Sequence, residues 1–167
     1  MRYDELKLGL SMDYEPNVSG KLSGRSLARH KAMSILYQLE LLGLYSVLRD
    51  FDEITRLYYL EESSFLYALL KITTNNLEEI DNTLKRYTGS AKWENLPPLE
   101  KAILRLGAAQ ILYGNQLDGV PASVAIDEAV EQAKRYGYRN FHKFVNAILD
   151  KLRRELEGVK VDEALEK

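Results

Sequence analysis

The sequence predicts an all-α protein. Apolar residues recur at the three- and four-residue spacing of helices, no segment keeps the alternation of a strand, and glycines and prolines fall between the helical stretches. The chain has 167 residues, of which 46% are hydrophobic and 29% charged, a balance typical of one folded domain. We therefore expect about six helices, arranged as two small bundles that divide near residue 90.

The two ends of the chain are predicted to lie outside this helical domain. Residues 1–24 contain Gly, Ser, Pro and Asn with few periodic apolar positions, so they are expected to form a flexible N-terminal extension. Residues 159–167 form a short charged tail, which is expected to be frayed. The helical domain itself should span residues 25–158.

The first helix of the domain is predicted to begin at Ser26. From there apolar residues follow one helical stripe as far as Gly43, where the helix should end. Arg25, Arg29 and His30 lie on a flank of this stripe. We therefore expect the first two turns to present positive charge to solvent.

Five more helices follow from the same pattern. Prolines at 97, 98 and 121 suit the first turn of a helix, and glycines supply the stops. In the helix after Pro121, Val124, Ala125 and Ala129 are expected to face the core. The predicted ranges are 46–60, 62–87, 97–113, 121–136 and 141–157.

Charge is distributed unevenly along a chain whose formal net charge is only −2. Segment 50–81 holds eight acidic and two basic residues and should repel phosphate. Segment 131–155 holds seven basic and three acidic residues, and segment 25–37 holds three arginines or lysines with no acidic residue. The two basic segments are candidates for contact with a polyanion.

Several classes of function lack the residues that they require. The chain has no cysteine, which excludes disulfides, thiolate metal sites and a cysteine nucleophile, and its two histidines, His30 and His142, do not suggest a metal site. No glycine-rich phosphate loop and no Gly-x-Ser-x-Gly motif is present. We expect a protein that is not an enzyme and has no cofactor. Without an apolar run of ~20 residues or a signal peptide, a cytoplasmic location is expected.

Basic and aromatic residues are interleaved between residues 134 and 144. Phosphates require cations, and unstacked bases require aromatic faces, so this composition is typical of single-stranded RNA binding. An alternative is that Phe141 and Phe144 complete the core while the basic side chains serve solubility and complement the helix dipole.

Four stretches resemble the NusB family. LEKAILRLGAAQILY (99–113), VPASVAIDEAVEQAKRYG (120–137) and HKFVNAILDKL (142–152) are similar to the C-terminal half of NusB proteins, and ARHKAMSILYQLEL (28–41) is similar to their first helix. Their order and spacing make the likeness specific, and it covers about residues 25–155.

The resemblance implies a fold of six to seven helices in two roughly perpendicular three-helix bundles. It also implies a transcription antitermination factor that binds boxA-type single-stranded RNA with NusE, within the RNA polymerase antitermination complex, and supports ribosomal RNA transcription. Tyr37 and Glu100 would contact the protein partner. The RNA-binding positions that it implies are Arg25, Arg29, Lys31, Tyr37, Tyr87, Asn140, Lys143 and Phe144.

The chain departs from the family pattern at its basic first helix. Family members often begin this helix with three or more consecutive arginines, whereas here Arg25 is followed by Ser26 and Leu27. The extension of 24 residues has no counterpart in short members and is slightly acidic. We hypothesise that it shields the surface around Arg25.

There are two alternatives. In the first, the chain is a helical adaptor or homodimer in which the same face binds protein and not RNA. In the second, it is the NusB-like domain of an RNA cytosine methyltransferase, but no segment after Gly158 could form a nucleotide-binding sheet. Separately, tyrosines at helical spacing are more often core than contact residues, which leaves both roles open for Tyr37 and Tyr87.

Overall fold

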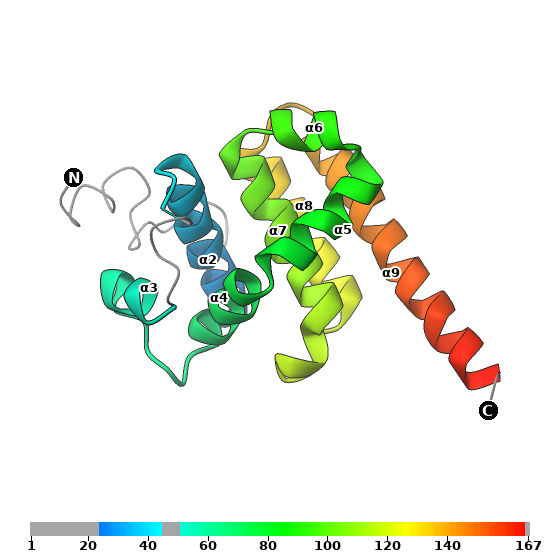
Figure 1. Cartoon of the computed structure of the whole chain (residues 1–167), viewed down its shortest axis with the longest axis horizontal. Coiled ribbons are helices and arrows are strands. Elements are labelled where there is room, and N and C mark those ends of the chain that lie inside the picture. The colour runs from blue at the N-terminus through cyan, green and yellow to red at the C-terminus, as the bar shows by residue number, and fades with distance from the viewer. Residues whose placement is uncertain (1–23, 45–50, 166–167) are drawn as a thin grey trace.

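The structure is a computed structural model that describes residues 24–44 and 51–165 (Figure 1). The described residues form α-helices and one short 3-10 helix and contain no strand, which confirms the predicted all-α class. The helices are α2 (Gly24–Leu41), α3 (Phe51–Tyr58), α4 (Phe65–Asn75), α5 (Leu77–Thr88), α6 (Ser90–Asn95), α7 (Pro98–Tyr113), η1 (Gly114–Gln116), α8 (Ala122–Tyr136) and α9 (Phe141–Leu165).

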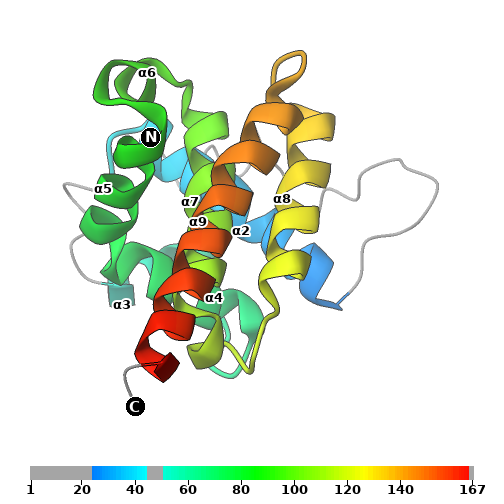
Figure 2. The ribbon, with the colours of Figure 1, turned by 90° about the vertical axis from the view of Figure 1, so that its right-hand side faces the viewer.

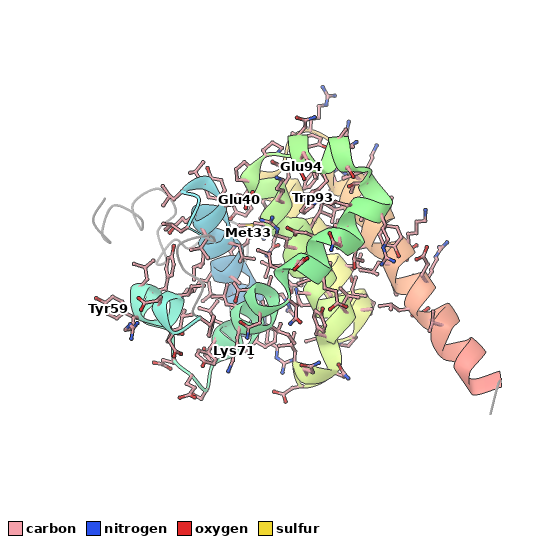
Figure 3. The ribbon with its side chains drawn as sticks, in the orientation of Figure 1. Met33, Glu40, Tyr59, Lys71, Trp93 and Glu94 are labelled. Carbon is pink, nitrogen blue, oxygen red and sulfur yellow. The ribbon has the colours of Figure 1, made fainter. Side chains whose placement is uncertain are left out.

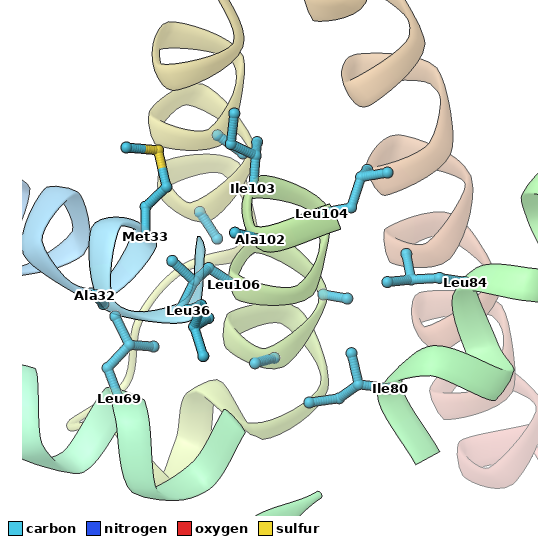
Figure 4. Close-up of a cluster of buried hydrophobic side chains, with 14 of the residues drawn as sticks. Ala32, Met33, Leu36, Leu69, Ile80, Leu84, Ala102, Ile103, Leu104 and Leu106 are labelled. Carbon is cyan, nitrogen blue, oxygen red and sulfur yellow. The ribbon is translucent and has the colours of Figure 1, made fainter. Parts of the chain in front are cut away.

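Helix α7 is the centre of the core. Every residue from Glu100 to Gln110 is buried, and α7 packs against α2, α4, α5, α8 and α9. The buried apolar side chains of these helices meet around it (Figure 4). Gly107 allows α9 to pack closely against α7, because a Cβ at this position would lie 2.5 Å from Cδ1 of Leu149 on α9.

The remaining helices lie on two sides of α7. Helices α2, α3 and α4 pack together on one side, and α8 and α9 pack against each other on the other side (Figures 1 and 2). Helix α5 contacts α6, α7 and α9. In both views α6 and the turn between α8 and α9 lie at the same end of the molecule.

A buried ion network joins α7 to α2 and α5. Arg105 of α7 donates from Nε and Nη2 to the two carboxylate oxygens of Asp81 on α5, at 2.8 and 2.9 Å, and from Nη1 to Glu40 on α2 at 2.9 Å. Lys101 lies 3.5 Å from Glu40. Burial alone would raise the pKa of Glu40, but the hydrogen bonds and charges of Arg105 and Lys101 hold it below its ordinary value. The indole of Trp93 on α6 lies beneath both cations.

The predicted helix over 62–87 is wrong as a single element. The structure has two helices, α4 and α5, which meet at Asn76. Its backbone leaves the helical region, with φ −118° and ψ 24°, and its side-chain Nδ2 donates to the carbonyl of Ile72 at 2.7 Å. The side chain thereby takes a carbonyl that a continuing helix would have used, an ability that makes asparagine a poor residue for helix interiors.

Other boundaries also differ from the predictions. Helix α6 follows Gly89, whose φ of +86° ends α5, and was not predicted. Helix α9 runs past Gly158 to Leu165. In α8, Val124 is 38% exposed and Ile126 is buried in its place. Residues 1–23 of the predicted extension, and 46–50 of the predicted helix 46–60, lie outside the described residues.

Candidate nucleic-acid interface

The turn between α8 and α9 is built so that its polar side chains face outward. Gly137 ends α8 where a Cβ would meet the Phe141 ring at 2.6 Å and the carbonyl of Ala133 at 2.8 Å. Asn140 adopts a left-handed backbone with φ +69°, and its carbonyl accepts from the Lys143 amide at 3.1 Å in the first turn of α9. The chain therefore reverses within four residues.

Aromatic rings form a row from this turn into the core. The Tyr138 and Phe141 centroids are 4.9 Å apart, and those of Phe141 and Phe144 are 6.0 Å apart. Phe141 is fully buried, Phe144 is half-buried and Tyr138 is 46% exposed. The prediction that Phe141 completes the core is confirmed, whereas Tyr138 and Phe144 keep part of their surface in solvent.

Exposed cations lie in the same turn and in the helix ends beside it. Lys134, Arg139 and Lys143 are exposed, and Asn140 is exposed between them. The N-terminus of α9 has no acidic residue in its first turn, so its positive partial charge adds to theirs. This end of the molecule offers the cations and aromatic surface that single-stranded RNA requires.

Lys92 on α6 belongs to the same surface, although sequence reasoning missed it. Its Nζ lies 4.3 Å from the centroid of the Phe144 ring. The two residues are far apart in the sequence, and no helix was predicted where α6 lies. The contact forms only because the folded chain brings Lys92 of α6 to the first turn of α9.

The prediction that Arg29 and His30 face solvent is wrong. Arg29 is 3% exposed: its Nε donates to Gln110 Oε1 at 2.6 Å, and its Nη1 lies 3.4 Å from Glu128 Oε1. Burial lowers the pKa of Arg29, and Glu128 opposes that effect. His30 is also buried, with Nε2 2.9 Å from the hydroxyl of Tyr136. Both residues are used to pack α2 against α7 and α8.

Arg25 lies one turn before Arg29 on α2, and both guanidiniums lie over the ring of Phe65. Arg25 and Lys31 are less buried than Arg29. They line a groove of about 580 Å³ between α2 and the segment that joins α3 to α4. The Arg25 guanidinium lies 4.7 Å from the centroid of Phe65 and 3.7 Å from the carboxylate of Asp118, which precedes α8. Phe144 follows the other end of α8, a helix of 15 residues and about 22 Å. The two predicted basic segments therefore do not form one compact cluster.

The remaining predicted residues are held by neighbours within the fold. Tyr37 is half-buried and packs against the core. The hydroxyl of Tyr87 bonds to Glu155 on α9; burial, together with this carboxylate, raises the pKa of Tyr87 to about 12. Glu100, the predicted partner contact, is 5% exposed, and burial raises the pKa of its carboxyl. In this conformation its side chain is not accessible to a partner.

Neither a metal site nor a membrane-spanning helix is present in the described residues. Within residues 24–44 and 51–165, no group of three or more His, Cys, Asp or Glu side chains is arranged to hold a metal ion. None of the helices in that part of the chain is both long and apolar enough to cross a membrane.

Comparisons with known proteins give one consistent result. The model of the NusB family matches residues 26–154. A transcription antitermination protein NusB from Bacillus licheniformis is 32% identical over 80% of this chain and 98% of its own length, and one from Pseudomonas savastanoi is 36% identical over 85% and 84%. The solved structure of T. maritima NusB superposes with a TM-score of 0.64, at 29% identity, over 80% of this chain and 92% of that one.

Proposed function

The chain belongs to the NusB family, and on that premise we propose that it is an antitermination factor that binds boxA-type single-stranded RNA together with NusE. The family membership supports a role in transcription antitermination. We propose the RNA, the protein partner and a place in the RNA polymerase antitermination complex that transcribes ribosomal RNA.

One observation supports RNA binding most strongly. The turn between α8 and α9 and the helix ends beside it carry exposed cations and two rings, Tyr138 and Phe144, that remain partly in solvent. We propose that Lys143 and Arg139 neutralise phosphates, that Asn140 offers hydrogen bonds to base edges, and that Phe144 stacks on a base. Binding of this kind needs positioned groups and no catalytic step.

The first helix has a smaller part in this proposal than the sequence implied. Arg29 is buried in an ion pair and is not available to a phosphate, whereas Arg25 and Lys31 remain partly exposed along the groove. We therefore assign Arg25 and Lys31 to a second, separate stretch of the RNA path. Tyr37 and Tyr87 contribute through packing.

The experiment is a titration of a short boxA-like RNA at about 50 mM and about 200 mM salt, with and without NusE. We expect binding that weakens as salt rises, because each phosphate contact releases counterions. A protein that binds NusE but shows no salt-dependent RNA binding in either case would support the adaptor interpretation instead.

The N-terminal extension gives a second test. Residues 1–23 carry four acidic and three basic side chains and are joined directly to the helix that bears Arg25. We propose that they compete with RNA for this surface. Deletion of the extension, residues 1–24, is expected to strengthen RNA binding, and an unchanged affinity would count against the proposal.

A further inference from the structure

We propose that Lys92 is an additional RNA-binding residue: its ammonium group covers the ring of Phe144 in the free protein and moves to a phosphate when a base stacks on that ring. This inference rests on the proposed function and adds to it a residue from α6.

The first step is the position of α6. This helix lies at the same end of the molecule as the turn between α8 and α9 (Figures 1 and 2). It is fixed there by Trp93, which is 2% exposed beneath Lys101 and Arg105. Lys92, the neighbouring residue, is exposed on the outer surface of the same helix. A buried residue that fixes α6, Trp93, and an exposed cation, Lys92, are therefore adjacent on this helix.

The second step is that Lys92 is held only weakly. Its Nζ lies 4.3 Å from the Phe144 centroid, and among the described residues it makes no ion pair. The nearby carboxylate of Glu94 is directed to Lys85, at 3.4 Å. An exposed cation–π contact is weak, so the ammonium is easily displaced from the ring.

The third step is what replaces it. Stacking of a base on an aromatic side chain contributes more to binding than the cation–π contact that it would displace. The ammonium of Lys92 lies over a face of the Phe144 ring, so a base that stacks on this face must displace the lysine. The displaced ammonium remains beside the nucleotide, where a backbone phosphate offers it a stronger partner than the ring.

The test compares two exposed lysines that each lie near an aromatic ring. Lys71 on α4 lies 5.7 Å from the centroid of Tyr67, but at the end of the molecule away from Trp93 and Glu94 (Figure 3). Lys92→Met and Lys71→Met each remove one exposed charge and retain a side chain of similar length. Any effect of net charge alone is the same in both variants.

We expect Lys92→Met to weaken binding of a boxA-like RNA by roughly three- to tenfold and to reduce the slope of log affinity against log salt by about 0.7. Lys71→Met should leave both quantities unchanged, and Lys92→Arg should preserve them. Equal losses in the two methionine variants, or an unchanged slope in Lys92→Met, would overturn the inference. Absence of salt-dependent binding by the wild-type protein would overturn the proposed function itself.

A second readout follows the lysine directly. Because its ammonium lies over an aromatic ring, the Lys92 ε-methylene protons should be shifted upfield in the NMR spectrum of the free protein. Saturation with RNA should move these resonances to ordinary lysine positions, whereas those of Lys71 stay unchanged. Lys92 resonances that remain upfield in the RNA complex would show that the ammonium has not left the ring.

Discussion

Substitution of Arg29 by alanine is expected to destabilise the fold by about 3 kcal/mol. The side chain is 3% exposed and donates a charged hydrogen bond to Gln110 at 2.6 Å, a class of bond worth about 1.5–3 kcal/mol. Its loss also leaves Glu128 without a cation in a partly buried site, and breaking such pairs costs about 3–5 kcal/mol when both groups are fully buried. Glu128 retains some access to solvent, which places our figure at the lower end.

The assay is thermal unfolding, with Arg25→Ala as the matched control. For a chain of this size a loss of about 3 kcal/mol lowers Tm by about 6–12 °C. Arg25 is on the same helix, but its side chain is 44% exposed and its partner Asp118 is 93% exposed. Removal of this ion pair and of the contact with Phe65 should change the free energy of unfolding by about 1 kcal/mol or less. Double substitution of Gln110 and Glu128 by Leu and Gln should reduce the effect of Arg29→Ala, because its partners are then absent.

The result that refutes this reasoning is specific. If Arg29→Ala unfolds at the temperature of the wild-type protein and nevertheless loses RNA affinity, Arg29 contacts RNA and its burial is not maintained in the complex. Loss of affinity together with loss of stability agrees with our assignment of Arg29 to packing.

Two further perturbations address packing and pH. Burial lowers the pKa of His30, so the unfolded chain binds its proton more readily; the free energy of unfolding should fall as pH decreases below about 6.5, and the difference between the wild-type protein and His30→Gln should shrink between about pH 7.5 and about pH 5.5 in urea titrations. Gly107→Ala should cost about 1–3 kcal/mol through its contact with Leu149, whereas Gly158→Ala, with no atom within 4 Å, should stabilise α9 by up to about 1 kcal/mol.

The predictions for His30 and for the two glycines can each be refuted. A constant difference between the wild-type protein and His30→Gln across the pH range would mean that the histidine is not maintained in its neutral form. Similar melting temperatures for the two alanine variants would mean that the approach of α9 to α7 is looser than the structure has it.

The sequence was sufficient for the helices whose ends are marked by proline or glycine. Pro98 begins α7, Pro121 precedes α8, and Gly137 ends it, close to the predicted positions. These residues act through the local backbone, either by fixing φ or by relieving steric conflict, and so their effect can be seen without tertiary contacts.

Boundaries that depend on side-chain hydrogen bonds or on packing were not predictable in this way. Asn76 ends α4 through a bond from its own amide to Ile72, and asparagine does this only in some contexts. Helix α6 has only six residues, which gives too few positions for a periodic pattern. Its place is fixed by Trp93 against cations of α7, a contact that no local pattern contains.

The same distinction separates the predicted site residues. A basic residue beside an apolar stripe is predicted to be exposed when only its own helix is considered. Arg29, however, contacts Gln110 of α7 and Glu128 of α8, which are more than 80 positions away in the sequence. Charge at the turn between α8 and α9 was predictable, because a tight turn exposes its side chains whatever packs around it. The contact of Lys92 with Phe144 was not, since it depends on how α6 meets α9.

The location of the buried cations bears on how a chain of formal net charge −2 can hold a polyanion. Arg29, Arg105 and Lys101 are each paired with carboxylates inside the fold, so their charges do not reach solvent. What an approaching strand meets is set by the exposed groups. At the end formed by α6 and the start of α9 these include Lys92, Arg139 and Lys143, while the exposed carboxylate of Glu94 is paired with Lys85. The acidic segment 50–81 lies chiefly on α3, α4 and α5, away from that turn, so repulsion of phosphate there would orient the strand and not exclude it.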